Sequence, residues 1–200
     1  MTARFGWHST LSDFVSTKPM LIEKSLVEFL PGSSPQQVQS WRSSIKWLQR
    51  EYSYCIKEES ASYNNKTILE YELPRDFRRP DVLVLRGGLV VVLEVKGRVG
   101  MAQAARDQVA AYARDLRAYH RACANQKVIP ILVPSNGKPN PELIDDVWVV
   151  GPDGVHDLLL QLGAGDDAVG LTPDEFLAED AYAPLPSIVQ AARALFEKEE

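Results

Sequence analysis

The spacing of apolar and polar residues predicts two helices in the first part of the chain. Residues 18–30 have helical periodicity, with Pro19 near the start and Pro-Gly directly after the end. The next segment opens with Ser34-Pro-Gln-Gln, a capping-box pattern with proline at the first helical position. We expect this second helix to run to about residue 52, because apolar side chains recur at helical spacing: Val38, Trp41, Ile45 and Leu48.

Two apolar, β-branched segments flank a pair of glycines within residues 78–97, and this pattern predicts a β-hairpin. If Gly87 and Gly88 form a two-residue loop, Arg86 faces Leu89 across the hairpin. That single pairing fixes the register of both strands, because each step away from the loop pairs the next two residues.

The predicted register gathers three charged residues on one face of the hairpin. Asp81 lies directly opposite Glu94, with Cβ atoms about 5 Å apart as in any facing antiparallel pair. Lys96 follows Glu94 by two residues and therefore points to the same side. Strand geometry alone thus predicts a cluster of two carboxylates and one ammonium.

The rest of the pattern alternates strands and helices, which indicates an α/β fold with a mixed sheet and helices on both faces. The near-continuous apolar run Leu89 to Val95 is typical of a strand that is covered on both sides. The expected elements are a strand at 67–73, a long helix at 101–123, strands at 127–134 and 146–150, a helix at 153–162, a loop at 163–170 and a final helix at 184–196.

Charge is distributed unevenly along the chain, although the net charge is only −5. Residues 75–127 carry a local balance of +6, whereas residues 139–200 carry −12. A basic middle segment favours a phosphate-bearing partner, and nucleic acid is the expected one. The alternative for any single arginine is a solvated helix face.

Two facing carboxylates repel each other unless one is protonated or a cation lies between them. One alternative is a cross-strand salt bridge of Lys96 with Asp81 or Glu94, but that leaves the other carboxylate unpaired. A hard divalent ion with oxygen ligands satisfies both carboxylates. The residue types therefore favour a metal site at this end of the hairpin.

Pro80-Asp81 followed by Glu94-Val95-Lys96 resembles the Pro-Asp … Glu-x-Lys pattern of the PD-(D/E)xK nuclease superfamily. Downstream, Gln108 and Tyr112 resemble the Gln-x-x-x-Tyr motif of its RecB-like branch, and at i and i+4 they share one helix face. The resemblance covers roughly residues 35–150 and implies a restriction-endonuclease-like core: a β-hairpin, a crossover helix and a parallel strand.

The resemblance implies a metal-dependent nuclease, with DNA favoured over RNA. Asp81, Glu94 and the Val95 carbonyl would bind Mg²⁺ or Mn²⁺, which activates a water and polarises the phosphate. Lys96 would orient that water or stabilise the developing negative charge. Gln108 and Tyr112 would orient the site or the substrate, although for Tyr112 simple packing against the sheet is the alternative.

Further acidic residues are candidates for the same site. Glu70 and Glu72 alternate on the strand predicted at 67–73, and Glu70 is the favoured additional metal ligand; a solvent-facing edge pair is the alternative. Relatives often carry an acidic residue or histidine on the first helix, where this chain offers only Glu51 near the helix end. The three histidines have no metal-ligand spacing, and two cysteines cannot hold an iron-sulfur cluster.

The chain also resembles the N-terminal nuclease portion of bacterial nuclease-helicase fusions, which implies a helicase or ATPase domain as a partner. No P-loop pattern occurs within the 200 residues. We expect an N-terminal helical extension at 1–34, a nuclease core at 35–163, and an acidic extension or linker at 164–200. The absence of a signal-like or membrane-spanning pattern leads us to expect a cytoplasmic protein.

Two other functions remain open from the sequence. A nuclease-like fold can serve as an inactive nucleic-acid-binding or scaffold module, because fold does not determine activity. A phosphate-handling hydrolase with a different substrate is the second alternative. Oligomeric state has no signature in the sequence.

Overall fold

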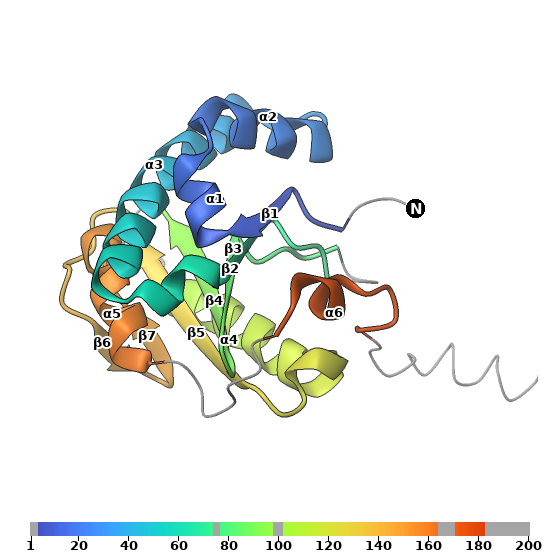
Figure 1. Ribbon diagram of the computed structural model, residues 1–200, viewed down its shortest axis with the longest axis vertical. Coiled ribbons are helices and arrows are strands. Elements are labelled where there is room, and N and C mark those ends of the chain that lie inside the picture. Colours follow the sequence, from blue (N-terminus) through green and yellow to red (C-terminus); the bar gives the residue numbers. More distant parts are fainter. Residues whose placement is uncertain (1–3, 74–76, 98–101, 164–170, 183–200) are drawn as a thin grey trace, which may run out of the picture.

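A seven-stranded mixed sheet forms the centre of the computed structural model, which describes residues 4–73, 77–97, 102–163 and 171–182 (Figure 1). The strand order is β1-β2-β3-β4-β5-β7-β6, in which β1 to β4 pair antiparallel, β5 and β7 continue in parallel, and β6 pairs antiparallel with β7. The strands are β1 (Trp7–Thr10), β2 (Lys66–Leu69), β3 (Val82–Arg86), β4 (Leu89–Lys96), β5 (Lys127–Pro134), β6 (Glu142–Ile144) and β7 (Val147–Val149).

Helices cover both faces of this sheet, so the predicted fold class is confirmed and is compatible with a restriction-endonuclease-like core. Figure 1 shows α3 and α4 on opposite sides of the strands. The helices are α1 (Leu11–Ser16), α2 (Pro19–Phe29), α3 (Pro35–Glu58), α4 (Ala102–Tyr119), α5 (Val155–Leu162) and α6 (Pro173–Leu177), with short 3₁₀ turns at η1 (Ser60–Asn64), η3 (Arg121–Cys123) and η4 (Pro152–Gly154).

The hairpin of β3 and β4 has the predicted register. Arg86 pairs with Leu89, and Val82 pairs with Leu93 at the far end. Gly87 has φ +56°, a left-handed conformation that a two-residue hairpin turn requires and glycine adopts without a Cβ clash. The turn chemistry therefore sets which residues of the two strands face each other.

Alternation along the hairpin divides the core into two layers. Val82, Val84, Val91 and Leu93 pack towards α3. The intervening residues pack towards α4: Leu83, Leu85, Val90 and Val92. Such two-sided burial explains why both strands are apolar throughout. It also fixes the sides available to polar residues where the strands end.

Three predicted boundaries are wrong. The helix predicted at 101–123 ends as α4 at Tyr119, because His120 leaves the helical conformation with ψ 112°. The helix α3 continues to Glu58 instead of ending near residue 52, because its last turns bury Tyr52 and Cys55 in the core. The strand predicted at 67–73 ends as β2 at Leu69, because Glu70 has φ +54° and leaves the extended conformation.

Four short elements lack a sequence prediction: the edge strands β1 and β6 and the helices α1 and α6. The strand β1 lies within the segment expected to be a helical extension, and it pairs with β2. The predicted helix 184–196 and most of the predicted loop 163–170 lie outside the described residues. None of the helices within the described ranges combines the length and apolar composition needed to cross a membrane.

Candidate functional site

Asp81 lies at the end of the hairpin, one residue before β3 begins. Its Oδ2 accepts a hydrogen bond of 2.7 Å from the backbone N–H of Val95 on the neighbouring strand. The observed register, extended by one residue beyond Val82, places Asp81 opposite Glu94 as predicted. The Asp81 carboxylate therefore bridges the ends of β3 and β4.

Glu94 brings the other predicted residues together. Its side chain is buried, and Oε1 accepts hydrogen bonds from Lys96 Nζ at 2.7 Å and from Gln108 Nε2 at 2.9 Å. Gln108 Nε2 also lies 2.9 Å from the Tyr112 hydroxyl. The strand β4 and the helix α4 therefore meet through one polar chain of four side chains.

The second oxygen of Glu94, Oε2, is buried and has no hydrogen-bond partner among the described residues. Unpartnered buried carboxylate oxygens are unfavourable, because burial removes water without supplying a substitute. A bound cation would satisfy this oxygen, and carboxylate oxygens are the ligands that Mg²⁺ and Mn²⁺ prefer.

The pKa shifts of Asp81 and Glu94 also favour a cation at this position. Burial, reinforced by the negative charges of Glu94 and Glu70, raises the pKa of Asp81 well above its ordinary value. Burial also raises the pKa of Glu94, although the Lys96 ammonium opposes this shift. Both carboxyls therefore hold protons more tightly than usual, and a nearby divalent cation would reverse this by favouring their ionised forms.

Glu70 approaches from the β2 side but turns towards α3. Its Oε1 accepts a hydrogen bond of 2.8 Å from the indole N–H of Trp41, and Arg79 Nε lies 3.4 Å from Oε2. Glu72 also comes within 3.7 Å of the Arg79 guanidinium. Both oxygens of the predicted additional ligand thus have partners within the protein.

Two arginines directly before Pro80 belong to the site, and the sequence pattern does not assign them a role. Arg78 donates to Asp115 at 2.6 Å, and its guanidinium lies 5.6 Å from the centre of the Tyr112 ring. Arg79 contacts Glu70 as described above. The adjacent Arg-Arg pair is the signal in the sequence that could have identified them.

A pocket enclosing about 360 Å³, part of it open to solvent, lies between α3 and the ends of the strands. Its polar lining residues come from α3 and from the segments that end β2 and precede β3: Gln37, Ser40, Ser44, Glu70 and Asp81. Asp81 therefore borders this pocket, and the neighbouring Glu94 is held by Gln108 of α4.

No group of three or more His, Cys, Asp or Glu side chains is arranged to hold a metal ion in the part of the chain that the structure describes. An ion at the hairpin end would therefore need backbone or water oxygens in addition to Asp81 and Glu94. The Val95 carbonyl is the backbone ligand predicted from the sequence.

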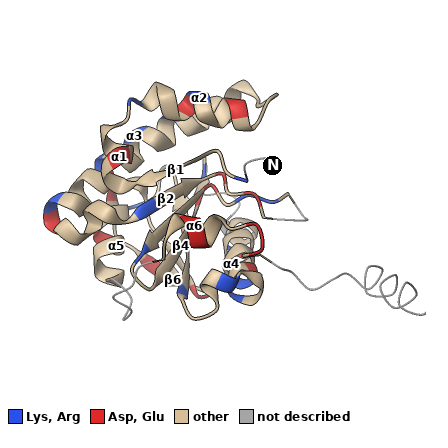
Figure 2. Cartoon of the chain, turned by 45° about the vertical axis from the view of Figure 1, so that its right-hand side comes forward, with Lys and Arg blue, Asp and Glu red and all other residues tan. Residues whose placement is uncertain are grey.

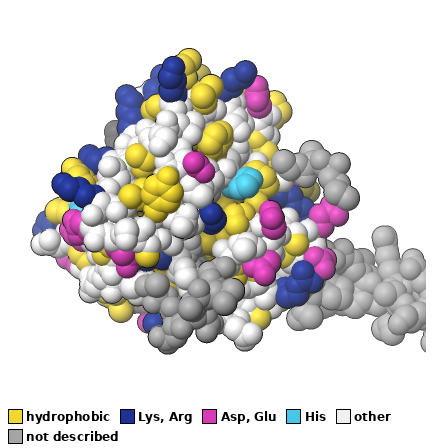
Figure 3. All heavy atoms as spheres, in the orientation of Figure 1, with side chains coloured by type: hydrophobic (Ala, Val, Ile, Leu, Met, Phe, Trp, Pro, Cys, Tyr) yellow, Lys and Arg dark blue, Asp and Glu magenta, His cyan; other side chains and the backbone are white. Residues whose placement is uncertain are grey.

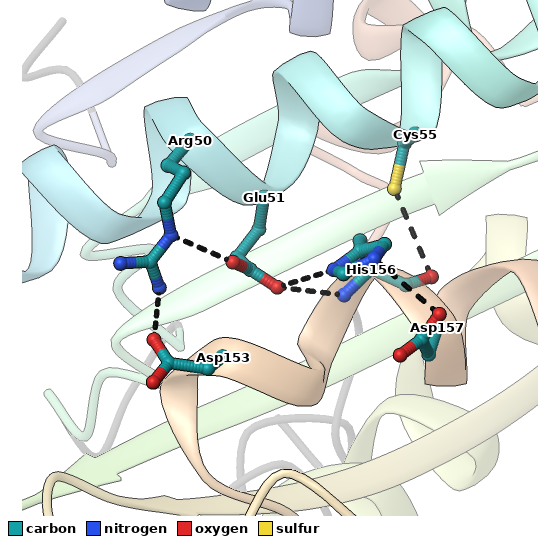
Figure 4. Close-up of polar contacts among 6 residues, drawn as sticks. All are labelled: Arg50, Glu51, Cys55, Asp153, His156 and Asp157. Atoms are coloured by element: carbon teal, nitrogen blue, oxygen red, sulfur yellow. Dashed lines mark hydrogen bonds and ion pairs between the residues drawn. The ribbon is translucent and has the colours of Figure 1, made fainter.

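Glu51 belongs to a separate cluster between α3 and α5 (Figure 4). It is fully buried, accepts from Arg50 at 3.0 Å, and accepts from both the backbone N–H and Nδ1 of His156. Arg50 also pairs with Asp153. These contacts hold α5 against α3, so Glu51 and His156 have a structural explanation away from Asp81.

Basic and acidic positions are mixed over the helices (Figure 2). In the view of Figure 3, several Lys and Arg side chains lie along the upper left, over α2 and α3. Arg42, Lys46 and Arg50 of α3 line a shallow groove, but Arg42 already makes a bidentate contact with Glu23. The hairpin end therefore has the stronger chemical case for a reaction site.

Comparison of the chain with protein-family models and with curated proteins finds no match. The resemblance to PD-(D/E)xK nucleases therefore rests on the motif residues themselves. The arrangement of these residues in space is an observation independent of the motif. The motif says nothing about the Oε2 atom of Glu94, which has no hydrogen-bond partner among the described residues.

Proposed function

We propose that the chain is a divalent-metal-dependent nuclease that hydrolyses phosphodiester bonds, with DNA as the favoured substrate. The observation that carries the proposal is the buried, unpartnered Oε2 of Glu94 beside the facing carboxylate of Asp81. A structural salt bridge explains Lys96 and one oxygen of Glu94, but it does not explain the second oxygen or Asp81.

The donor set fits Mg²⁺ or Mn²⁺ better than softer metals, because every candidate ligand is an oxygen. Asp81, Glu94 and the Val95 carbonyl would hold the ion. When bound, it would supply a more acidic water and a polarised phosphate. Because the pKa values of the two carboxyls are raised, metal binding would compete with protons at both.

The protein groups around Glu94 have distinct parts in this reaction. The Lys96 ammonium lies 2.7 Å from Glu94 Oε1. In the proposed reaction it would orient an attacking water and stabilise charge that develops on the phosphate. Gln108 donates to the same oxygen from α4, which would keep the Glu94 carboxylate in one orientation. Tyr112 in turn fixes Gln108.

Purified full chain, incubated with labelled single-stranded DNA, duplex DNA and RNA in Mg²⁺, Mn²⁺ or EDTA, tests the proposal. We expect cleavage of DNA that requires the divalent ion and is lost in Asp81→Asn and Lys96→Ala. Arg121→Ala is the matched control, because this exposed arginine pairs with Asp180 beyond the end of α4.

The panel also separates the alternative functions. Cleavage that survives in EDTA or in Asp81→Asn would remove the site assignment. Binding of nucleic acid without cleavage under every metal condition would favour the scaffold function. A helicase or ATPase partner and a cytoplasmic location, both expected from the sequence, stay predictions.

A further inference from the structure

Glu70 leaves the strand pattern at the point where a second acidic ligand would be expected. Ile68 packs towards α4 and Leu69 towards α3, so simple alternation would return Glu70 to the α4 side. Its φ of +54° ends β2 instead, and the side chain reaches Trp41 on α3. Positive φ at a glutamate is unfavourable, so the surrounding contacts must hold it there.

The contacts that hold Glu70 leave little capacity for a metal ion. Trp41 donates to Oε1 at 2.8 Å from a nearly buried indole. The Arg79 guanidinium lies on the side of Oε2. A divalent ion bound by Glu70 would have to displace at least one of these partners, and it would be repelled by the permanent positive charge of the arginine.

Arg79 itself is held only in part. Nε approaches Glu70 at 3.4 Å, and Nη1 lies 3.2 Å from the Phe77 carbonyl and 3.7 Å from Glu72. Charge-assisted N–H···O bonds are usually about 2.7–2.9 Å, so these contacts are long. Among the described residues no hydrogen bond engages Nη2, and about 30% of the side chain is exposed. The guanidinium can therefore accept a further anionic partner.

The position of Arg79 close to Asp81 indicates that its further anionic partner is the substrate phosphate. It precedes Asp81 by two residues, and its contact Glu70 donates a backbone hydrogen bond of 3.0 Å to the Asp81 carbonyl and lines the same pocket as Asp81. Two-metal nucleases use a second ion to neutralise the scissile phosphate. A guanidinium performs the same electrostatic task, since its planar donors match two phosphate oxygens.

We propose that Arg79, held by a Glu70 carboxylate that Trp41 in turn fixes, is the second cation of this site, so that the chain binds one divalent ion and uses the arginine to bind the substrate phosphate. The inference rests on the proposed nuclease function. It assigns Glu70 the role of a positioning residue for Arg79 and not that of a metal ligand.

Mn²⁺ binding to the full chain, measured by calorimetry and electron paramagnetic resonance, tests the stoichiometry without any turnover. We expect one ion per chain with the spectrum of an isolated Mn²⁺. Arg79→Ala frees a Glu70 oxygen and should admit a second, weaker ion with a spin-coupled spectrum. The double variant Glu70→Gln/Arg79→Ala should return to one ion, because the freed carboxylate is gone.

Binding of a short DNA duplex in Ca²⁺, followed by fluorescence anisotropy, tests the phosphate contact. Arg79→Ala should weaken binding about tenfold and lower the slope of log K against log salt by about one. Arg79→Lys should restore part of the affinity, because it keeps the charge but not the fork. Arg121→Ala should bind like the original protein, and thermal melts of all variants check that they fold.

The outcomes distinguish this inference from the function on which it rests. Two ions in the original protein, or unchanged DNA affinity and salt slope in Arg79→Ala, would overturn the role of Arg79 while leaving the nuclease proposal intact. A single ion in Arg79→Ala would also count against it. Absence of any ion that depends on Asp81 and Glu94 would overturn both.

Discussion

Gln108 is one of the two side chains that bond the buried Glu94 carboxylate. Its amide lies 2.9 Å from both Glu94 Oε1 and the Tyr112 hydroxyl, and it joins the helix α4 to the strand β4. Burial raises the pKa of Tyr112, so its hydroxyl remains a neutral hydrogen-bonding group. The link thus consists of an amide and a phenol that stay uncharged beside two carboxyls.

Gln108→Ala should lower kcat about 10- to 100-fold with a smaller change in KM, because it releases the Glu94 carboxylate without removing it. Tyr112→Phe should have a weaker effect of the same kind. Steady-state kinetics on the best DNA substrate would measure both. A thermal melt of each variant accompanies the kinetics. If Gln108→Ala lost stability but kept its kcat, the residue would be a packing residue alone.

The sequence was sufficient to predict the positions of site residues that share a face of one strand or one helix. Glu94 and Lys96 share a strand face, and Gln108 and Tyr112 share a helix face, so each meeting follows from local geometry. Trp41 and Arg79 could not be placed in this way. Their contacts with Glu70 depend on one left-handed residue and on the packing of α3, neither of which has a local signature.

The β3–β4 hairpin is the element that positions the site. Its turn places Arg86 opposite Leu89, and the same register carries Asp81 to its place opposite Glu94 at the other end. A shift by one residue would send the two carboxylates to opposite faces. The geometry of the site therefore depends on the conformation of two glycines at the far end of the strands.

Gly87→Ala should destabilise the protein by about 1 kcal/mol, because alanine resists the left-handed conformation at φ +56°. Urea unfolding followed by circular dichroism would measure the loss. Gly97→Ala is the matched control: a Cβ there has no atom within 4 Å, and its φ lies outside the left-handed range. Equal stability of the two variants would contradict the assigned turn conformation.

Long helices and strands were predictable from the sequence, and short edge elements were not. The helices α3 and α4 and the strands β4 and β5 have enough residues for a pattern to emerge. In contrast, β1 and β6 have four and three residues, are partly exposed, and depend on neighbours brought by the fold. The last turns of α3 were missed because their burial comes from distant segments.

At the scale of the whole molecule, residues 171–182 return to pack on the end of α4. The His120 ring stacks on Phe176 with centroids 4.1 Å apart, and its Nε2 lies 3.0 Å from the Phe176 carbonyl. Backbone contacts with Ala181 and Tyr182 complete the attachment. Burial lowers the pKa of His120 to about 4.

Acid should therefore loosen this attachment. A histidine with a folded-state pKa of about 4 and an ordinary value of 6.5 favours folding fully above pH 6.5, and loses that contribution as the pH falls towards 4. The loss is at most about 3 kcal/mol. Urea unfolding at several pH values would show it. His120→Gln, which cannot titrate, should flatten the dependence between pH 6.5 and 4; an unchanged slope would contradict the assignment.

In the proposed function, Asp81 and Glu94 share one divalent ion that drives phosphodiester hydrolysis. The most direct test is the rate of DNA cleavage by the full chain in Mg²⁺, compared with folded Glu94→Gln under the same conditions. We expect metal-dependent cleavage whose rate falls at least about a thousandfold in the variant, the scale of losing a principal electrostatic group. Cleavage by Glu94→Gln at the original rate would contradict it.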